Sequence, residues 1–141
     1  MAEKLLFELV SPERLLLSQE VEMVVVPGTE GNFGALPRHA PLLSLVRPGV
    51  IDVYATRQAG VSQRLFVAGG YAEVMPERCT VLASEAVPLG EIDRARIDAQ
   101  LKELNEDLTD APDEAARRAI AGRIATAEAK IRAISASGPA H

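Results

Sequence analysis

The sequence has no tryptophan, one cysteine and only two histidines among its 141 residues. One cysteine cannot close a disulfide within the chain, and two histidines cannot supply a zinc cluster, so both kinds of scaffold are excluded. Positive charge is not in excess either, because 15 lysines and arginines stand against 20 aspartates and glutamates. Since nucleic-acid binding requires clustered positive charge, we expect no nucleic-acid partner.

Long apolar runs and catalytic patterns are also missing. Residues 1–4 lead into a mixed stretch, and nowhere do about 18 apolar residues follow one another, so we expect neither a signal peptide nor a transmembrane segment. No Ser-His-Asp or Cys-His spacing stands out, and the glycine-rich stretch 27–34 lacks the Gly-Lys-Ser/Thr of a phosphate-binding loop. We predict a protein that is not an enzyme and requires no cofactor or metal.

The first ninety residues show apolar side chains at every second position, which is the pattern of half-buried strands. Proline and glycine pairs separate these segments, as in a β-sandwich or barrel. The alternating sets are Leu5, Phe7 and Leu9; Val21, Met23 and Val25; Ile51, Val53 and Ala55; Leu65 and Val67; and Cys79, Val81 and Ala83. Cys79 is therefore predicted to be a core residue rather than a reactive thiol.

After residue 90 the apolar period becomes helical, with Ile97, Leu101, Leu104 and Leu108 on one face. A second helix is predicted to begin near Pro112, and its apolar stripe consists of Ala116, Ile120, Ile124, Ala127, Ile131 and Ile134. A short connection favours an antiparallel hairpin. We predict strands within 1–87, a linker at 88–91, the hairpin at 92–135 and a frayed tail at 136–141.

The hairpin allows two interpretations. Its alanine-rich seam, the helix-interior Gly122 and the acidic residues at the end of the first helix suit an element that rearranges easily. A stable hairpin that merely covers the sandwich is equally consistent. The exposed arginines of the second helix likewise suit either a solvated face or an acidic surface of another protein.

The stretch 21–42, which contains Pro27-Gly28-Thr29-Glu30-Gly31 and Pro37-Arg38-His39-Ala40-Pro41, closely resembles the ε subunit of F-type ATP synthases. The resemblance continues through 46–51 and 66–74, and more loosely from Glu91-Ile92-Asp93 onwards. It implies an α+β protein, with an N-terminal antiparallel β-sandwich of about ten strands followed by a C-terminal antiparallel two-helix hairpin.

The resemblance also implies a role. The ε subunit is a non-catalytic rotor subunit of the central stalk, which couples rotation of the c-ring to ATP synthesis in the α/β head of the proton-translocating enzyme. Its partners would be the γ subunit, the c-ring and the α and β subunits, and its helices would inhibit ATP hydrolysis. The implied location is peripheral, at the cytoplasmic face of the bacterial inner membrane.

Candidate site residues follow from matching positions. In the family, the loop around Gly31-Asn32-Phe33-Gly34 and the Pro-x-His-Ala-Pro segment share the end of the sandwich that faces γ and the c-ring, so the resemblance implies contacts by Glu30, Asn32, Phe33 and His39. The candidates for inhibitory contact with the α/β head are Arg117, Arg118 and Arg123. Asp93 and Arg96 match part of a motif that binds ATP as a regulatory ligand in some members.

His39 lies between two prolines that push their predecessors, Leu36 and Ala40, towards extended geometry, and the resulting rigid segment favours a structural or interface role for His39 over catalysis. A different class of function also fits the residues: a stand-alone binding module, whose sandwich holds a small ligand and whose hairpin mediates dimerisation.

Overall fold

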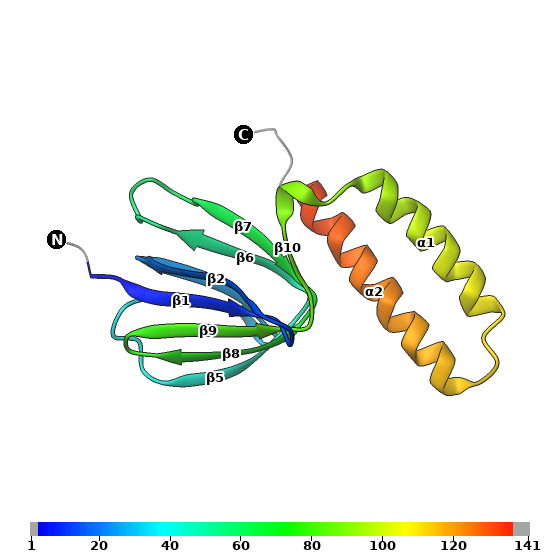
Figure 1. Ribbon diagram of the computed structural model, residues 1–141, viewed down its shortest axis with the longest axis horizontal. Coiled ribbons are helices and arrows are strands. Elements are labelled where there is room, and N and C mark those ends of the chain that lie inside the picture. The colour runs from blue at the N-terminus through cyan, green and yellow to red at the C-terminus, as the bar shows by residue number, and fades with distance from the viewer. Residues whose placement is uncertain (1–2, 137–141) are drawn as a thin grey trace. The chain divides into compact units, whose positions relative to one another are not determined.

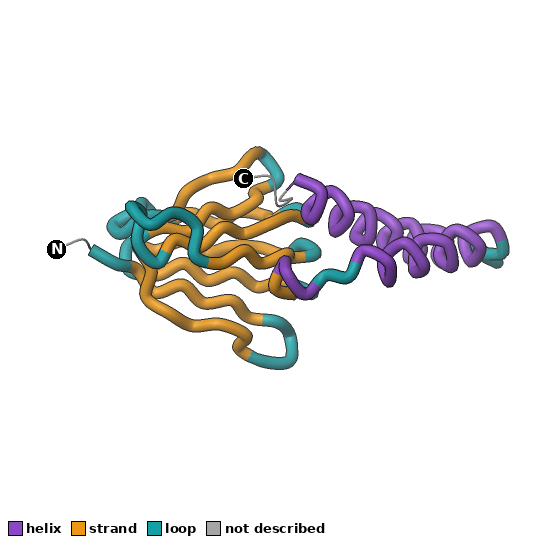
Figure 2. The backbone as a smooth tube through the Cα atoms, turned by 90° about the horizontal axis from the view of Figure 1, so that it is seen from above, coloured by secondary structure: helices purple, strands orange, loops and turns teal. Residues whose placement is uncertain are grey.

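The structure is a computed structural model that describes residues 3–136. It consists of two compact units, with the boundary between Leu89 and Gly90. The described strands all lie in the first unit and the two long helices in the second (Figures 1 and 2). The predicted fold class, an α+β protein with a sandwich followed by a helical hairpin, is confirmed.

Ten strands form one hydrogen-bonded sheet that folds into two layers, with nine strands on one path and β4 as a branch on β3. One layer has the order β10-β7-β6-β3, with β4 on β3, and the other has the order β5-β8-β9-β1-β2. A single residue pair, Gly28 with Val46, connects them. The strands are β1 (Leu5–Val10), β2 (Leu15–Val21), β3 (Met23–Gly28), β4 (Gly31–Ala35), β5 (Leu42–Val46), β6 (Gly49–Tyr54), β7 (Gln63–Val67), β8 (Gly70–Met75), β9 (Arg78–Ala83) and β10 (Ala86–Pro88).

The expected antiparallel sandwich contains one parallel pair. β1 and β9 run in the same direction, with Leu6 opposite Arg78 and Val10 opposite Leu82. Figure 1 shows them side by side, with β2 on the other side of β1 and β8 on the other side of β9. A parallel pair requires a long connection, and here almost the whole first unit lies between the two strands.

Alternation places the core as predicted in three of the five sets and, apart from Ala55, in a fourth. Leu5, Phe7 and Leu9 are buried, as are the members of the sets on β6, β7 and β9 except Ala55, which follows the end of β6. The prediction for Val21, Met23 and Val25 is wrong in its last two members. The chain bends at Glu22, between β2 and β3, and the alternation restarts one residue later, so Val24 and Val26 are buried instead.

The second unit contains α1 (Arg94–Thr109) and α2 (Glu114–Ala136), which pack side by side in opposite directions (Figure 1). A 3-10 turn, η1 (Leu89–Glu91), precedes α1 and directly follows β10. Asp93 and Asp113 cap the two helices: their carboxylates accept hydrogen bonds from the amides of Ala95 and Ala116. Pro112 therefore lies before α2 rather than in its first turn.

The predicted apolar faces of the hairpin are present. On α1, Ile97 and Leu104 are buried and Leu101 and Leu108 are half-buried. On α2 the buried side chains are alanines, Ala127, Ala129 and Ala133, while the isoleucines of the predicted stripe are half-buried. Ala136 ends α2, and the rest of the predicted tail, 137–141, lies outside the described residues.

Candidate functional site

The tip of the β3–β4 hairpin is a two-residue loop, Thr29-Glu30, between the paired residues Gly28 and Gly31. Both loop residues are exposed. A Cβ atom at Gly28 would lie 2.8 Å from the Gly31 carbonyl oxygen, and Gly31 has a φ of 131°, so both positions require glycine. The sequence thus builds a tight turn that presents the Glu30 carboxylate at one end of the sandwich.

Arg47, which no sequence motif indicated, is bonded to this hairpin. Its guanidinium donates to the carbonyl oxygen of Gly28 at 2.5 Å and to Oδ1 of Asn32 at 2.6 Å. Its backbone amide also donates to the carbonyl oxygen of Pro27. Arg47 stands 15 residues from Asn32 in the chain, so no local pattern indicates this contact. The only signal was an arginine directly before a Pro-Gly turn.

Phe33 is half-buried, and its role as a contact residue stays a prediction. Its side chain packs on the sandwich core, and two of its ring carbons would lie 3.2 Å from a Cβ atom at Gly28, so the ring lies close against that glycine. Phe33 therefore supports the hairpin tip from within.

His39 lies at the other end of β4 from Glu30, so the expectation that the two segments share one end of the sandwich is wrong. β4 runs from the tip at Gly31 to Ala35, and the Pro-x-His-Ala-Pro segment follows it. The imidazole Nδ1 lies 2.6 Å from the carbonyl oxygen of Ala40. Arg38, with a φ of 69°, donates its amide to the carbonyl oxygen of Pro76, which fixes this segment to the β8–β9 turn.

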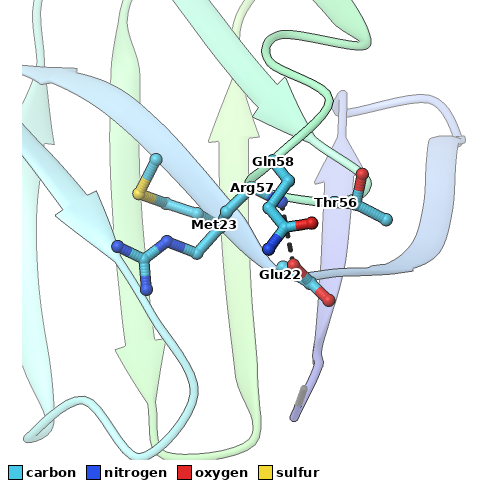
Figure 3. Close-up of a pocket in the computed structure, with 5 residues that line it drawn as sticks. All are labelled: Glu22, Met23, Thr56, Arg57 and Gln58. Atoms are coloured by element: carbon cyan, nitrogen blue, oxygen red, sulfur yellow. Dashed lines mark hydrogen bonds between the residues drawn. The ribbon is translucent and has the colours of Figure 1, made fainter. Parts of the chain in front are cut away.

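An open recess of about 750 Å³ lies at the bend between β2 and β3 (Figure 3). It is lined by Glu22, Met23, Thr56, Arg57 and Gln58. The Arg57 amide donates to Oε1 of Glu22 at 2.8 Å, whereas the Arg57 guanidinium is directed away from that carboxylate. The Thr56 hydroxyl and the Glu22 carboxylate in the recess are not hydrogen-bonded to each other, and the described residues contain no cluster of metal-ligating side chains.

The most distinctive surface is an apolar row across the outer face of one layer. Cross-strand pairing places Leu45 opposite Tyr71, Tyr71 opposite Leu82, Leu82 opposite Val10, and Val10 opposite Leu15. Leu45 is 64% exposed, Leu15 53% and Tyr71 47%. We call these five residues the outer apolar row. Contiguous apolar surface of this kind marks an interaction site in a folded domain.

In the second unit, the two residues that match the ATP motif lie at the start of α1. The Asp93 carboxylate accepts the Ala95 amide at 3.0 Å as a helix cap, while Arg96 is exposed. The neighbouring Arg94 donates to Oγ of Ser135 at 3.2 Å and lies 3.9 Å from Asp98. ATP binding by Asp93 and Arg96 stays a prediction.

Arg117, Arg118 and Arg123 are exposed along the first half of α2. Among residues 3–136, no acidic side chain forms an ion pair with any of the three. Their guanidinium groups are thus available to another surface.

The comparisons with known proteins agree over both units. The family model described as "ATP synthase, Delta/Epsilon chain, beta-sandwich domain" matches residues 4–89, and the model for the C-terminal domain of the ATP synthase epsilon subunit matches residues 93–141. The protein belongs to the ATP synthase epsilon family. It is accordingly a non-catalytic subunit of the ATP synthase complex.

Relatives in this family align along most of their length. The ATP synthase epsilon chain of Rhodospirillum centenum is 54% identical over 96% of this protein and 94% of its own length. The corresponding protein of Rhodospirillum rubrum is 55% identical over 94% of this protein and 98% of its own length.

Solved structures give the same result. A subunit in the mitochondrial ATP synthase of Euglena gracilis, from a structure of OSCP, F1 and the c-ring, superposes with a TM-score of 0.72 at 27% identity, over 92% of this protein and 80% of that subunit. A subunit in the central stalk and c-ring structure from Tetrahymena thermophila shares the fold over 92% of this protein and 96% of its own length, with a TM-score of 0.57 at 15% identity. Among residues 3–136, neither long helix is apolar enough to cross a bilayer.

Proposed function

We propose that this epsilon-family protein is a central stalk subunit that binds γ through the outer apolar row and couples rotation of the c-ring to ATP synthesis. It would act peripherally, at the cytoplasmic face of the bacterial inner membrane. The observation that carries the proposal is the row itself. A non-catalytic subunit that transmits torque needs a large, dry contact with its neighbour, and this row crosses five strands of a rigid sheet.

The row lies where a partner can reach it. Leu43, two residues before Leu45 on the same side of β5, is 70% exposed and extends the apolar surface. The Thr80 hydroxyl donates a hydrogen bond to the Glu8 carboxylate. This pair lies two residues before Val10 and Leu82 on the same two strands and would form part of a polar rim. An apolar centre with a polar rim is the usual composition of a stable interface.

Binding to purified γ tests this assignment. Leu45→Asp should weaken γ binding at least tenfold, because removing a buried leucine from an interface loses about 1.5–3 kcal/mol. Binding is measured by titration calorimetry. The isolated variant should keep its unfolding temperature, since Leu45 is largely exposed in the unbound protein.

The matched control is Gln63→Asp, which adds the same charge at an exposed position of β7 in the other layer. Unchanged γ binding by Leu45→Asp, or equal losses in both variants, would contradict the outer apolar row as the γ surface.

The proposal includes a regulatory role for the hairpin, in which Arg117, Arg118 and Arg123 contact an acidic segment of the α/β head. The support is that all three are exposed without an acidic partner among the described residues. Replacing them together with alanine should raise ATP hydrolysis by the assembled enzyme several-fold, because the inhibitory contact loses its charge. Hydrolysis is measured as phosphate release.

Two variants sharpen this test. The triple lysine variant retains the charge and should remain inhibitory, and Arg132→Ala, at another exposed arginine of α2, should have no effect. If the triple alanine variant hydrolyses ATP at the wild-type rate, these arginines have no part in inhibition.

A further inference from the structure

Three contacts converge on the β3–β4 hairpin tip. Phe33 packs beneath it, the backbone amide of Thr29 donates to the carbonyl oxygen of Leu45 at 3.0 Å, and Arg47 binds it from the side. An exposed two-residue loop with no such supports would be among the least ordered parts of a sandwich. Here the loop is attached to β5 on the neighbouring layer.

The Arg47 guanidinium is attached to the hairpin at two points. It reaches two acceptors on different strands of the same hairpin, the carbonyl oxygen of Gly28 at the end of β3 and the amide oxygen of Asn32 in β4. Two donors fixed in one plane restrain both strands at once, which a flexible ammonium group cannot do. Within residues 3–136, no hydrogen bond or ion pair engages the exposed Glu30 side chain at the end of the loop.

We infer that Arg47 is a positioning residue that holds the β3–β4 turn rigid, so that Glu30 is presented to a partner surface rich in hydrogen-bond donors. This inference rests on the proposed function, because the partner is a neighbouring subunit of the rotor. Glu30 makes the contact with the partner. Arg47 orders the loop before binding, so that less conformational entropy is lost when the contact forms. The tip is preorganised at the opposite end of β4 from His39.

The first measurement is amide hydrogen exchange of the isolated full-length protein. In Arg47→Ala, the amides of Thr29 and Gly31 should exchange about tenfold faster, which corresponds to about 1.4 kcal/mol of lost local stability. The amide of Phe7 should keep its wild-type exchange rate. The control Arg64→Ala removes an arginine that pairs with Asp52 on the β6–β7 pair and should leave the tip unchanged.

A double-mutant cycle separates a direct clamp from general loosening. Asn32→Asp gives Arg47 a charged acceptor and should slow exchange at the tip, because a hydrogen bond between charged groups is stronger. The same substitution should have no such effect in the Arg47→Ala background. Arg47→Lys keeps the charge but has no planar guanidinium, so exchange at the tip should be slower than in Arg47→Ala but faster than in the wild type.

The second measurement is the affinity of each variant for ATP synthase stripped of this subunit, in inverted membranes. Glu30→Gln and Arg47→Ala should both lower the affinity, and Arg47→Lys should recover part of the loss. Faster exchange at the tip together with lower affinity for the stripped enzyme, both in Arg47→Ala, supports the inference. Wild-type exchange at the tip in Arg47→Ala overturns it.

The two remaining outcomes are distinguishable. If Arg47→Ala speeds exchange but binds as well as wild type while Glu30→Gln binds more weakly, rigidity is not needed for contact and the positioning role is overturned. If Glu30→Gln also binds as well as wild type, the tip is not a contact surface. That result overturns the inference that Glu30 contacts a partner. The separate proposal that γ binds the outer apolar row is tested by Leu45→Asp.

Discussion

At the scale of single residues, Cys79 shows how burial determines the reactivity of a side chain. Its thiol is fully buried in β9, and burial raises its pKa from 9.0 to about 12. The cause is desolvation, which disfavours the thiolate. A thiol that stays protonated and enclosed is neither a nucleophile nor a metal ligand, so the predicted core role of Cys79 is confirmed.

The raised pKa of Cys79 predicts a loss of stability at alkaline pH. The unfolded thiol releases its proton near pH 9.0 and the folded thiol only near pH 12, so above pH 9 the unfolded state binds fewer protons. The free energy of unfolding should therefore fall with rising pH in this window, by up to about 1.4 kcal/mol per pH unit from this group. Urea unfolding at a series of pH values measures it.

Cys79→Ala is the control for this prediction. It should be less stable at neutral pH because it leaves a cavity, but it should lack the cysteine's share of the alkaline decline, so the stability difference from the wild type should shrink above pH 9. Parallel stability curves for the wild type and Cys79→Ala would contradict the assignment.

At the scale of elements, the hairpin is limited by its second helix. Gly122 lies inside α2 with nothing within 4 Å of the position that a Cβ atom would occupy. Glycine in a helix interior costs about 1 kcal/mol relative to alanine. The buried side chains of α2 are alanines, which contribute little apolar area to the seam. The element is thus held together by modest packing and two aspartate caps.

Gly122→Ala should stabilise the hairpin by about 0.5–1 kcal/mol, because alanine has the higher helix propensity and meets no neighbour. Hydrogen exchange of α2 amides in the full-length protein measures the change. Gly60→Ala is the matched control: it is equally free of neighbours, but its φ of 81° disfavours a side chain, so it should destabilise the sandwich. Unchanged exchange of the α2 amides in Gly122→Ala would contradict this account.

At the scale of the whole molecule, the two units have separate cores. The sandwich core draws on both layers, from Leu5 in β1 to Ala83 in β9, and the hairpin buries its own side chains between Ile97 and Ala133. The boundary between Leu89 and Gly90 falls inside the η1 turn that follows β10. Each unit thus has its own buried core, as a separate domain does.

Deletion of residues 90–141 should therefore leave a folded sandwich that still binds γ, because the outer apolar row lies entirely in the first unit. Circular dichroism and titration with γ provide the measurement. A truncated protein that is folded yet does not bind γ would contradict the division of roles between the units. Leu45→Asp in the truncated protein should again bind weakly, which ties any retained binding to the same surface.

Sequence pattern alone was enough for much of this architecture. Alternation at Leu5, Phe7 and Leu9 predicted a half-buried strand, and the change to helical spacing at Ile97 predicted the hairpin, because side-chain periodicity directly reflects which face is buried. The tight turn between Gly28 and Gly31 is also a local property, because a side chain at Gly28 would clash with the backbone and Gly31 has a positive φ. The failure at Met23 and Val25 shows the limit, since one bend at a strand junction reverses the buried face.

Other features depended on the register between distant strands, which local periodicity does not specify. The outer apolar row exists only because Leu45, Tyr71 and Leu82 come into line across β5, β8 and β9. The contact of Arg47 with Asn32 likewise required the layers to meet at Gly28 and Val46. These surfaces arise from long-range pairing, whose free energy belongs to the whole sheet rather than to any segment of the sequence.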